Sequence, residues 1–478
     1  MSYGIIVYTL GKVLSVEGIC MILPLICSLI YRDSCTNLFL FCAILCLLCG
    51  VLMTLKKPKK KTMYAKEGFV IVALSWIVIS IFGAFPFYFS GYIPNYIDAL
   101  FETVSGFTTT GASVLSNIEA LPKSLLFWRS FTHWIGGMGV LVFLVAILPL
   151  SGGGNIHLIK AESPGPSVSK LVPKVKSSAK ILYTIYIALT VLQVILLLFG
   201  KMSLFEALTI TFGTAGTGGF GVLNSSAGEY SSYVQIVITI FMIIFGVDFS
   251  IYYLILMRRF KDALKSEELR TYLGIIVVSI ILISINCRGL FSTLSDTIKH
   301  SAFQVSSIIT TTGFSTTDFD LWPSFSKTIL VMLMFCGACA GSTGGGIKVS
   351  RLLILSKSIL REIRIAAHPR MIKKITVNGR MVEHETIRNI NVFLAVYIAI
   401  FFVSWLIISL DNFGFTTNFT AVAATFNNVG PGLAEVGPTK NFALYSPLST
   451  IVLTFDMLFG RLEIFPLLVM LSPYSWKK

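Results

Sequence analysis

Long apolar stretches divide the chain from end to end. Each is about 18 residues or more, enough to cross the roughly 30 Å hydrocarbon core of a bilayer. Ten such stretches begin near Val13, Leu38, Phe69, Leu125, Ile181, Val234, Leu273, Ile329, Val392 and Pro447. Segments of this length in lipid are helical, because a helix satisfies its own backbone hydrogen bonds. The sequence therefore predicts an all-α polytopic membrane protein whose even number of crossings puts both termini on one side.

Composition agrees with lipid as the main solvent. Hydrophobic residues make up 55% of the chain, charged residues 13%, and the mean hydropathy is +0.81, far from the balance of soluble proteins. A second apolar stretch closely follows the first, so we do not expect the first to be a cleaved signal peptide. The nine cysteines are an odd number, and five of them lie in the first two stretches, so no disulfide framework is expected.

The distribution of basic residues predicts the orientation. The connections 56–66, 160–180, 258–270 and 348–380 hold 25 Lys and Arg, whereas the alternate connections 91–124, 201–233, 288–327 and 411–446 hold 6. By the positive-inside rule the first set and both termini are cytoplasmic. The net charge of +15 is thus spread over short juxtamembrane loops that contact anionic membrane lipid, and nucleic-acid binding is not expected.

A short phrase recurs four times on the other side of the membrane. It reads Thr108-Thr109-Thr110-Gly111, Ala215-Gly216-Thr217-Gly218, Thr310-Thr311-Thr312-Gly313 and Asn427-Asn428-Val429-Gly430, with glycine intervals of 107, 95 and 117 residues. A moderately apolar segment too short to cross precedes each phrase: Tyr96–Phe107, Leu204–Thr214, Ala302–Ile309 and Phe415–Phe426. A full crossing follows each phrase.

This repeat unit of span, short pore helix, turn and span predicts four units around one central pore. We expect an N-terminal two-span extension at 1–62 and repeats at 63–160, 161–262, 263–370 and 371–478. Non-helical backbone at membrane depth is tolerated where it lines a cavity or is buried in protein. Carbonyls of such turns can replace the hydration shell of a cation, and the negative ends of the short helices favour a cation there.

The eighth apolar stretch is interrupted. Five glycines occupy the ten residues from Gly337 to Gly346, and each costs a helix about 1 kcal/mol relative to Ala. A nucleotide-binding P-loop is disfavoured because Ile347 separates the last glycine from Lys348. Zinc binding by Cys336 and Cys339 lacks a second ligand pair. Close helix packing and a mobile gate below the pore turns remain as interpretations.

Polar residues inside the apolar stretches have competing interpretations. Arg461 either forms a local ion pair with Glu463 or Asp456, or projects toward the pore and touches the glycine-rich segment. Asp248 either caps a helix end or acts on passing cations. For Arg129 and His133, which are flanked by tryptophans, anchoring at the membrane interface is favoured over a role in ion handling.

Acidic residues near the short helices also have two interpretations. Asp98, Glu102 and Glu206 either cap the starts of these helices or concentrate cations at the outer mouth. No Ser/His/Asp arrangement, metal cluster or phosphate loop is recognisable at credible spacing, so we do not expect an enzyme.

Several motifs together resemble the Trk/Ktr/HKT potassium-transporter superfamily over essentially the whole chain. They are ETVSGFTTTGAS from Glu102, FWRSFTHWIGGMG from Phe127, TGGFG from Thr217, TTTGFS from Thr310, GSTGGGIK from Gly341, NNVGPG from Asn427 and GRLEIF from Gly460. The extra N-terminal spans are more similar to the TrkH branch than to the shorter KtrB branch. The resemblance implies potassium uptake across a bacterial inner membrane.

The resemblance also implies the site residues. It assigns a potassium-binding filter to Thr109, Thr110, Gly111, Gly216, Thr217, Gly218, Thr311, Thr312, Gly313, Asn428, Val429 and Gly430, with Gly111, Gly218, Gly313 and Gly430 as the filter glycines. It assigns a gate to Gly337, Gly341, Gly344, Gly345, Gly346 and Arg461. In related plant transporters, serine at the position of Gly111 accompanies sodium preference, so glycine favours potassium. The fourth turn departs most from the others.

Partners follow from the same resemblance. The family assembles as a homodimer with one pore per chain and pairs with a cytosolic nucleotide-binding regulatory ring, for which the basic 33-residue segment Lys348 to Arg380 offers a docking surface. No covalent cofactor is expected, and potassium is the permeant ligand. A channel-like subunit of a potassium-pumping ATPase and a sodium- or proton-coupled symporter remain as alternatives.

Overall fold

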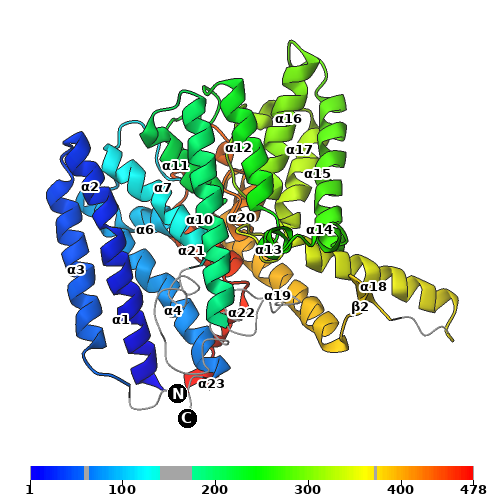
Figure 1. Cartoon of the computed structure of the whole chain (residues 1–478), viewed down its shortest axis with the longest axis horizontal. Helices are drawn as coiled ribbons and strands as arrows, with labels where there is room; N and C mark the ends of the chain where they lie inside the picture. Colours follow the sequence, from blue (N-terminus) through cyan, green and yellow to red (C-terminus); the bar gives the residue numbers. More distant parts are fainter. Residues whose placement is uncertain (1, 59–63, 140–174, 371–373, 477–478) are drawn as a thin grey trace.

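The computed structural model describes residues 2–58, 64–139, 175–370 and 374–476. These residues are helical apart from connecting loops and one short antiparallel hairpin, in which β1 (Thr376–Val377) pairs with β2 (Arg380–Met381). Figure 1 shows the helices standing side by side in one body, with both termini at the same end. The prediction of an all-α polytopic membrane protein is confirmed.

The N-terminal extension is a helical hairpin at one edge of the body (Figure 1). It consists of α1 (Tyr3–Cys20), α2 (Ile22–Tyr31) and α3 (Thr36–Thr54). Small residues bring α1 and α3 together: a Cβ on Gly50 would lie 2.7 Å from the Gly11 carbonyl oxygen, and one on Gly18 would lie 3.0 Å from that of Ala43. Backbones approach this closely in membranes where small residues face each other.

Four units follow, each with the same order of elements. The first contains α4 (Ala65–Gly83), α5 (Phe85–Phe89), α6 (Tyr96–Phe107) and α7 (Lys123–Gly137). The second contains α10 (Val175–Phe199), α11 (Leu204–Ala215), α12 (Ser232–Phe245), α13 (Phe249–Leu256) and α14 (Phe260–Leu264). The third contains α15 (Glu267–Asn286), α16 (Leu294–Ile309), η1 (Phe319–Leu321), α17 (Ser324–Cys336) and α18 (Val349–Ala367). The fourth contains α19 (His384–Ile408), η2 (Ser409–Asp411), α20 (Phe415–Phe426), η3 (Ala434–Val436), α21 (Pro447–Arg461), α22 (Phe465–Leu471) and α23 (Pro473–Trp476).

The short pore helices are α6, α11, α16 and α20, and they end where the sequence predicts to within one residue. Helix α16 begins earlier than predicted, at Leu294 instead of Ala302, and α11 ends one residue later, at Ala215. Side-chain oxygens of Asn95, Ser203 and Thr293 accept backbone N–H groups in the first turns of α6, α11 and α16. Glu206 completes a capping box with Ser203, so the capping interpretation holds for this acid.

The first helix of each unit is long enough to cross a membrane, whereas the helix after the pore turn is shorter. Among the described residues, six helical stretches are long and apolar enough to cross a membrane, and they form the N-terminal hairpin and the first crossing of each unit. These are Tyr3–Tyr31, Thr36–Thr54, Ala65–Phe89, Lys180–Phe199, Glu267–Asn286 and His384–Asp411. The second helices, α7, α12, α17 and α21, have only 15, 14, 13 and 15 residues.

The break predicted after α17 is present, and the crossings predicted from Val234 and Pro447 are interrupted as well, which the sequence did not predict. Helix α12 meets α13 at a 91° bend, where Asp248 accepts the Ser250 N–H at 2.9 Å and caps α13. Helix α21 ends before Glu463 and Ile464, whose φ angles of 52° and 71° cannot continue a helix. The inner part of the crossing predicted from Leu125 lies outside the described residues.

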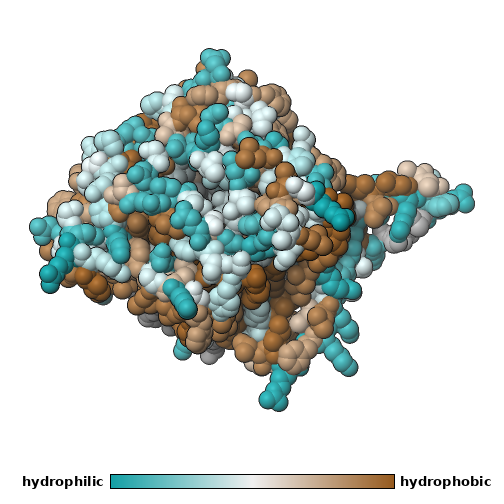
Figure 2. Space-filling view, turned by 90° about the horizontal axis from the view of Figure 1, so that it is seen from above, coloured by the Kyte–Doolittle hydropathy of each residue, from teal (hydrophilic) through white to brown (hydrophobic). Residues whose placement is uncertain are grey.

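The predicted unit boundaries near residues 62, 160 and 370 lie within or beside stretches that the structure does not describe. The boundary predicted at 262 falls inside the short helix α14. Tyr3 and Trp476 stack with ring centroids 6.2 Å apart, which brings the two ends of the chain together. Figure 2, viewed from above Figure 1, shows polar residues over much of the middle of that face and apolar residues mainly toward its rim.

Candidate functional site: a ring of four backbone turns

The four turns after the pore helices share one backbone geometry. At the second position of each turn the φ angle is 55° in Thr109, 55° in Thr217, 59° in Thr311 and 55° in Asn428. At the third position an N–H donates to the carbonyl five residues earlier, at 2.8 to 2.9 Å, in Thr110, Gly218, Thr312 and Val429. At the fourth position Gly111, Gly219, Gly313 and Gly430 have φ angles of 81°, 80°, 85° and 99°. The turns are therefore structural equivalents.

This geometry corrects the register of the second turn. Gly219, not Gly218, is equivalent to Gly111, and Gly218 is equivalent to Thr110. Gly216, which the sequence placed in the filter set, caps the end of α11. The physical reason is that α11 extends one residue beyond the predicted Thr214, which moves the turn by one position. The predicted positions of the other three filter glycines match the structural register.

The turns close into a ring through their glycines. A Cβ on each glycine would collide with the carbonyl oxygen of the third residue in the next turn. The pairs are Gly111 with Gly218, Gly219 with Thr312, Gly313 with Val429, and Gly430 with Thr110. The last pair joins the fourth unit back to the first, so the ring is complete. Glycine is required at these positions by both the positive φ and the missing space.

The turns are buried up to their last positions, where Gly111, Gly219 and Gly313 are partly exposed, and the ring is reached by four helix ends. The threonines of the first and third turns, and Asn428 and Val429 of the fourth, have no solvent exposure. Helices α6, α11, α16 and α20 all end at the ring. Their C-terminal carbonyl ends carry partial negative charge, which favours a cation at the centre without an acidic side chain.

The fourth turn is held differently from the others. Asn428 donates from Nδ2 to Thr110 Oγ1 and to the Met457 carbonyl, both at 2.9 Å. Tyr397 donates to Asn427 Oδ1 at 2.8 Å. The amide of Asn428 thus ties the fourth turn to the first turn and to α21. The predicted departure of this turn is visible in its side-chain contacts.

A loop between α17 and α18 lies directly against the ring. The Gly345 N–H donates to Thr311 Oγ1 at 2.7 Å. A Cβ on Gly345 would lie 2.6 Å from the Asn427 carbonyl oxygen, and one on Gly344 would lie 2.9 Å from that of Thr310. The glycines here permit close approach to the third and fourth turns.

The other end of this loop is held by the α12–α13 bend and by α15. Cys339 N–H donates to the Gly246 carbonyl at 3.0 Å, and Phe249 N–H donates to the Gly341 carbonyl at 3.1 Å. Glu268 Oε1 accepts the Ala340 N–H at 2.7 Å. Cys339 therefore takes part in backbone packing, and its thiol is free like those of the other cysteines. Within the described part of the chain, no group of three His, Cys, Asp or Glu is placed to hold a metal.

Arg461 contacts the loop, as one of its two interpretations predicted. Its guanidinium donates to the Thr343 carbonyl at 2.7 Å and to the carbonyls of Gly136 and Gly137 at 2.6 and 2.7 Å. The proposed local partners are engaged elsewhere, since Glu463 pairs with Arg351 and Asp456 accepts from Ser404 at 2.6 Å. The arginine thus connects the loop of the third unit to the end of α7.

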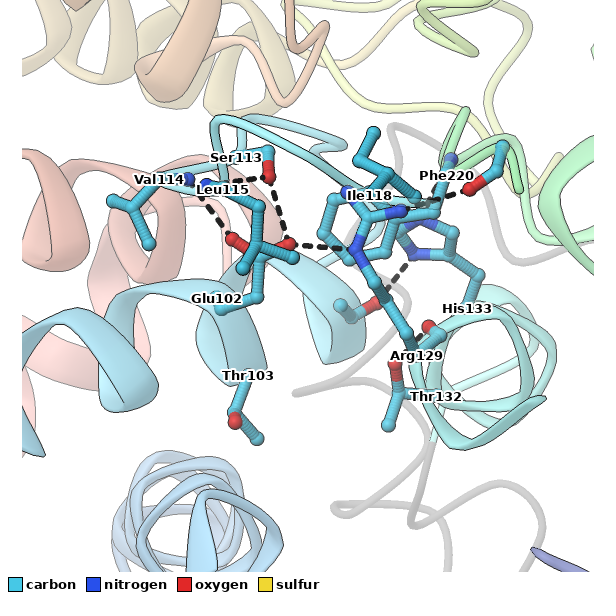
Figure 3. Close-up of polar contacts among 12 residues, drawn as sticks. Glu102, Thr103, Ser113, Val114, Leu115, Ile118, Arg129, Thr132, His133 and Phe220 are labelled. Atoms are coloured by element: carbon cyan, nitrogen blue, oxygen red, sulfur yellow. Dashed lines mark hydrogen bonds and ion pairs between the residues drawn. The ribbon is translucent and has the colours of Figure 1, made fainter. Parts of the chain in front are cut away.

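The interfacial interpretation of Arg129 and His133 is wrong. Arg129 is 2% exposed and His133 is fully buried. Figure 3 shows both side chains pointing from α7 toward the first and second turns. Arg129 Nε and Glu102 Oε1 form an ion pair at 2.6 Å, so Glu102 is a buried partner and not a helix cap. Removing one member of such a pair costs about 3–5 kcal/mol, because the other charge stays buried.

Three further residues at the site were missed by sequence reasoning. Gly219 was hidden by the adjacent Gly218. Lys348 is buried and its ammonium donates to the Gly344 carbonyl inside the loop. Glu268 lies in the first turn of α15, where an acidic residue commonly stabilises the start of a helix. The neighbouring sequence does not indicate that it contacts Ala340, 72 residues away.

Comparisons with known proteins agree with this architecture. The family model described as "TrkH: Cation transport protein" matches residues 34–478. The Trk system potassium uptake protein TrkH of Salmonella typhimurium is 37% identical over 466 residues, 96% of each chain. That of Vibrio parahaemolyticus is 35% identical over 487 residues and covers 100% of both chains. The crystal structure of the potassium transporter TrkH from Vibrio parahaemolyticus matches with a TM-score of 0.90 at 33% identity, covering both chains completely.

These relatives are transport proteins and not enzymes. The resemblance found in the sequence motifs is confirmed over the length of the chain. The helices, the ring of turns and the family match together show that the chain belongs to the TrkH family of cation transport proteins.

Proposed function

We propose that this protein carries potassium into the cell across a bacterial inner membrane, through the ring formed by its four turns. The observation that carries the proposal is the closure of the ring, in which each glycine faces a carbonyl of the next unit and the fourth unit returns to the first. A closed ring of backbone carbonyls can replace the hydration shell of a cation. The printed names of the relatives, potassium uptake proteins, support potassium as that cation.

In the ring, the protein supplies carbonyl dipoles and helix ends instead of formal charge. We assign to the ring the carbonyls of the third residues, Thr110, Gly218, Thr312 and Val429, each of which lies beside the glycine of a neighbouring turn. Binding by dipoles is strong enough to compensate for dehydration and weak enough to release the ion. The amide of Asn428 ties the fourth turn to the first turn across the ring.

The loop Gly337 to Gly346, with Arg461, forms the gate in this proposal. It packs against the third and fourth turns, and in this proposal an ion leaving the ring passes the loop. Its backbone is held by hydrogen bonds from several helices, so its displacement requires those bonds to exchange. The guanidinium of Arg461 adds a positive charge that raises the barrier for cations below the ring.

The assembly proposed for the protein follows the family resemblance. It comprises a homodimer with one pore per chain, cytoplasmic termini, and a cytosolic nucleotide-binding regulatory ring docked on the segment around α18. Both a gated channel and an ion-coupled symporter fit the ring and the loop. Reversal potentials measured under imposed potassium, sodium and proton gradients distinguish them, because coupling shifts the reversal potential away from that of potassium alone.

Substituting the ring glycines tests the proposed function. We expect Gly111→Ser and Gly219→Ala each to lower the potassium-to-sodium permeability ratio in proteoliposomes, because the added atoms displace a neighbouring carbonyl. The matched control is Gly91→Ala: Gly91 has a similar φ of 77° but open space around its Cα. Wild-type protein without potassium flux would refute the transport function. Unchanged selectivity in both variants would refute the role of the ring.

A further inference from the structure

The imidazole of His133 is enclosed by the second turn and the first pore helix. Its Nδ1 lies 2.6 Å from the Gly106 carbonyl oxygen, and its Nε2 lies 3.2 Å from the Phe220 backbone nitrogen. A carbonyl can only accept and a backbone N–H can only donate. The ring is therefore the neutral tautomer with the proton on Nδ1. It links the last turn of α6 to the residue that follows the filter glycine Gly219 (Figure 3).

The same imidazole explains why the second turn carries glycine at its third position. A Cβ on Gly218 would collide with several atoms of the His133 ring. The equivalent residues of the other turns, Thr110, Thr312 and Val429, all have branched side chains. In the second turn, the His133 ring occupies the space that the side chain at the third position occupies in the other three turns.

Arg129 contacts the same loop segment at the next residue, Gly221. It donates from Nη1 to the Gly221 carbonyl at 3.0 Å, and its guanidinium carbon lies 3.5 Å from the centre of the Phe220 ring. Glu102, from the first pore helix, fixes the guanidinium and also accepts from Ser113 and the Val114 N–H at 3.0 Å each. Through Glu102 and Arg129, the residues before and after the first turn are connected to the segment that follows the second turn.

We propose that His133 and Arg129 are positioning residues that set the second turn of the filter and so determine ion selectivity. The inference rests on the proposed function of the ring and adds to it the residues that position one of its four turns. His133 replaces the internal packing that a side chain gives the other turns, and it holds the Phe220 N–H by a hydrogen bond. Without it, the carbonyls of Gly218 and Gly219 lose their lateral support.

A size exchange between His133 and Gly218 tests the packing part of this inference. In the full-length protein, we expect His133→Ala and Gly218→Thr each to lower the potassium-to-sodium permeability ratio by roughly tenfold, the effect of losing or distorting about one buried hydrogen bond. The double variant places the Thr of the first and third turns in the space vacated by the ring. We expect it to recover selectivity above that of either single variant.

Two conservative variants test the hydrogen bonds separately. His133→Asn keeps a donor near the Nδ1 position, and His133→Gln keeps an acceptor near the Nε2 position. We expect Gln to retain more selectivity than Asn, because only it preserves the bond to the Phe220 N–H. Maximum flux is measured alongside, since a general packing defect lowers flux without changing the ratio.

The outcomes separate this inference from the proposed function. Selective potassium flux in the wild type with unchanged selectivity in His133→Ala and Gly218→Thr would overturn the positioning role and leave the ring intact. A double variant no better than its worse parent, with Gln and Asn equal, would also overturn it. Absence of potassium flux in the wild type would instead overturn the proposed function.

Discussion

At the scale of single residues, two basic side chains, the partly buried Arg461 and the buried Lys348, hold backbone carbonyls together. Arg461 binds three carbonyls from the loop and from α7, and Lys348 binds one inside the loop. A charge at this depth is costly unless protein groups replace water, and carbonyl groups at broken helix ends are available for that purpose. The broken helices leave carbonyls that need donors, and the two basic side chains need acceptors, so each supplies the partner that the other requires.

Replacing Arg461 tests its role in holding the loop closed. We expect Arg461→Ala to raise basal potassium flux roughly tenfold or more in the absence of any partner, because hydrogen bonds to a charged group contribute about 1.5–3 kcal/mol each. Arg461→Lys keeps the charge but cannot reach three carbonyls at once, and its flux should lie between the two. Flux through proteoliposomes at matched protein density measures this. Equal or lower flux in a folded Ala variant would leave Arg461 as a packing residue.

At the scale of elements, the start of α15 connects α18 to the loop. Glu268 accepts the Ala340 N–H of the loop at 2.7 Å and the Ser350 N–H of α18 at 3.1 Å. Its neighbour Glu267 pairs with Lys357 on α18. On the other side of α18, Arg351 pairs with Glu463 beside the α21–α22 break. These contacts connect α18 both to the loop and to the helix break that follows Arg461.

The connection through Glu268 can be broken selectively. Glu268→Ala leaves two backbone N–H groups without their acceptor, so we expect faster amide hydrogen exchange across residues 337–350 and a several-fold rise in basal flux. Glu268→Gln retains one acceptor oxygen at the same place and serves as the matched control, with exchange near that of the wild type. Equal exchange in the Ala variant and the wild type would show that the loop is held without this acid.

At the scale of the whole molecule, α18 is the element that stands apart. Figure 1 shows it extending away from the body together with the β1–β2 hairpin. Its outer part exposes Ile359, Leu360 and Ile363 beside Arg364, and Arg370 follows it in the chain. This exposed basic and apolar helix, joined to the loop at its first turn, is the surface on which we propose that the regulatory ring docks.

Neutralising this surface tests the docking proposal. We expect the combined substitution of Arg361, Arg364 and Arg370 by Gln to weaken binding of the regulatory ring by roughly tenfold at low salt, with a smaller effect at high salt because charges are screened. Arg258, Lys261 and Lys265, which are exposed on and beside α14, provide a control matched for net charge when all three are replaced by Gln. Binding is measured on purified detergent-solubilised protein. Undiminished binding of the triple variant would remove this surface from the interface.

Local features of the sequence were sufficient to predict much of the fold. The first crossing of each unit depends on a long apolar run, and the pore helices depend on short apolar runs that start at a capping residue and end at a Thr, Gly or Asn phrase. The break after α17 depends on its glycines. Each of these signals lies within about one element's length, so no distant contact is needed to recognise it.

Tertiary structure alone decided the rest. The register of the second turn required the neighbouring turns, because Gly218 and Gly219 are alike in sequence and differ only in which one faces the Thr312 carbonyl. The burial of Arg129 and His133 depended on partners as distant as Gly221 and Phe220. Arg461 contacts Gly136, which lies 325 residues away. Composition and periodicity indicate which residues are buried. Which polar groups pair in the interior depends on how the four turns come together to close the ring.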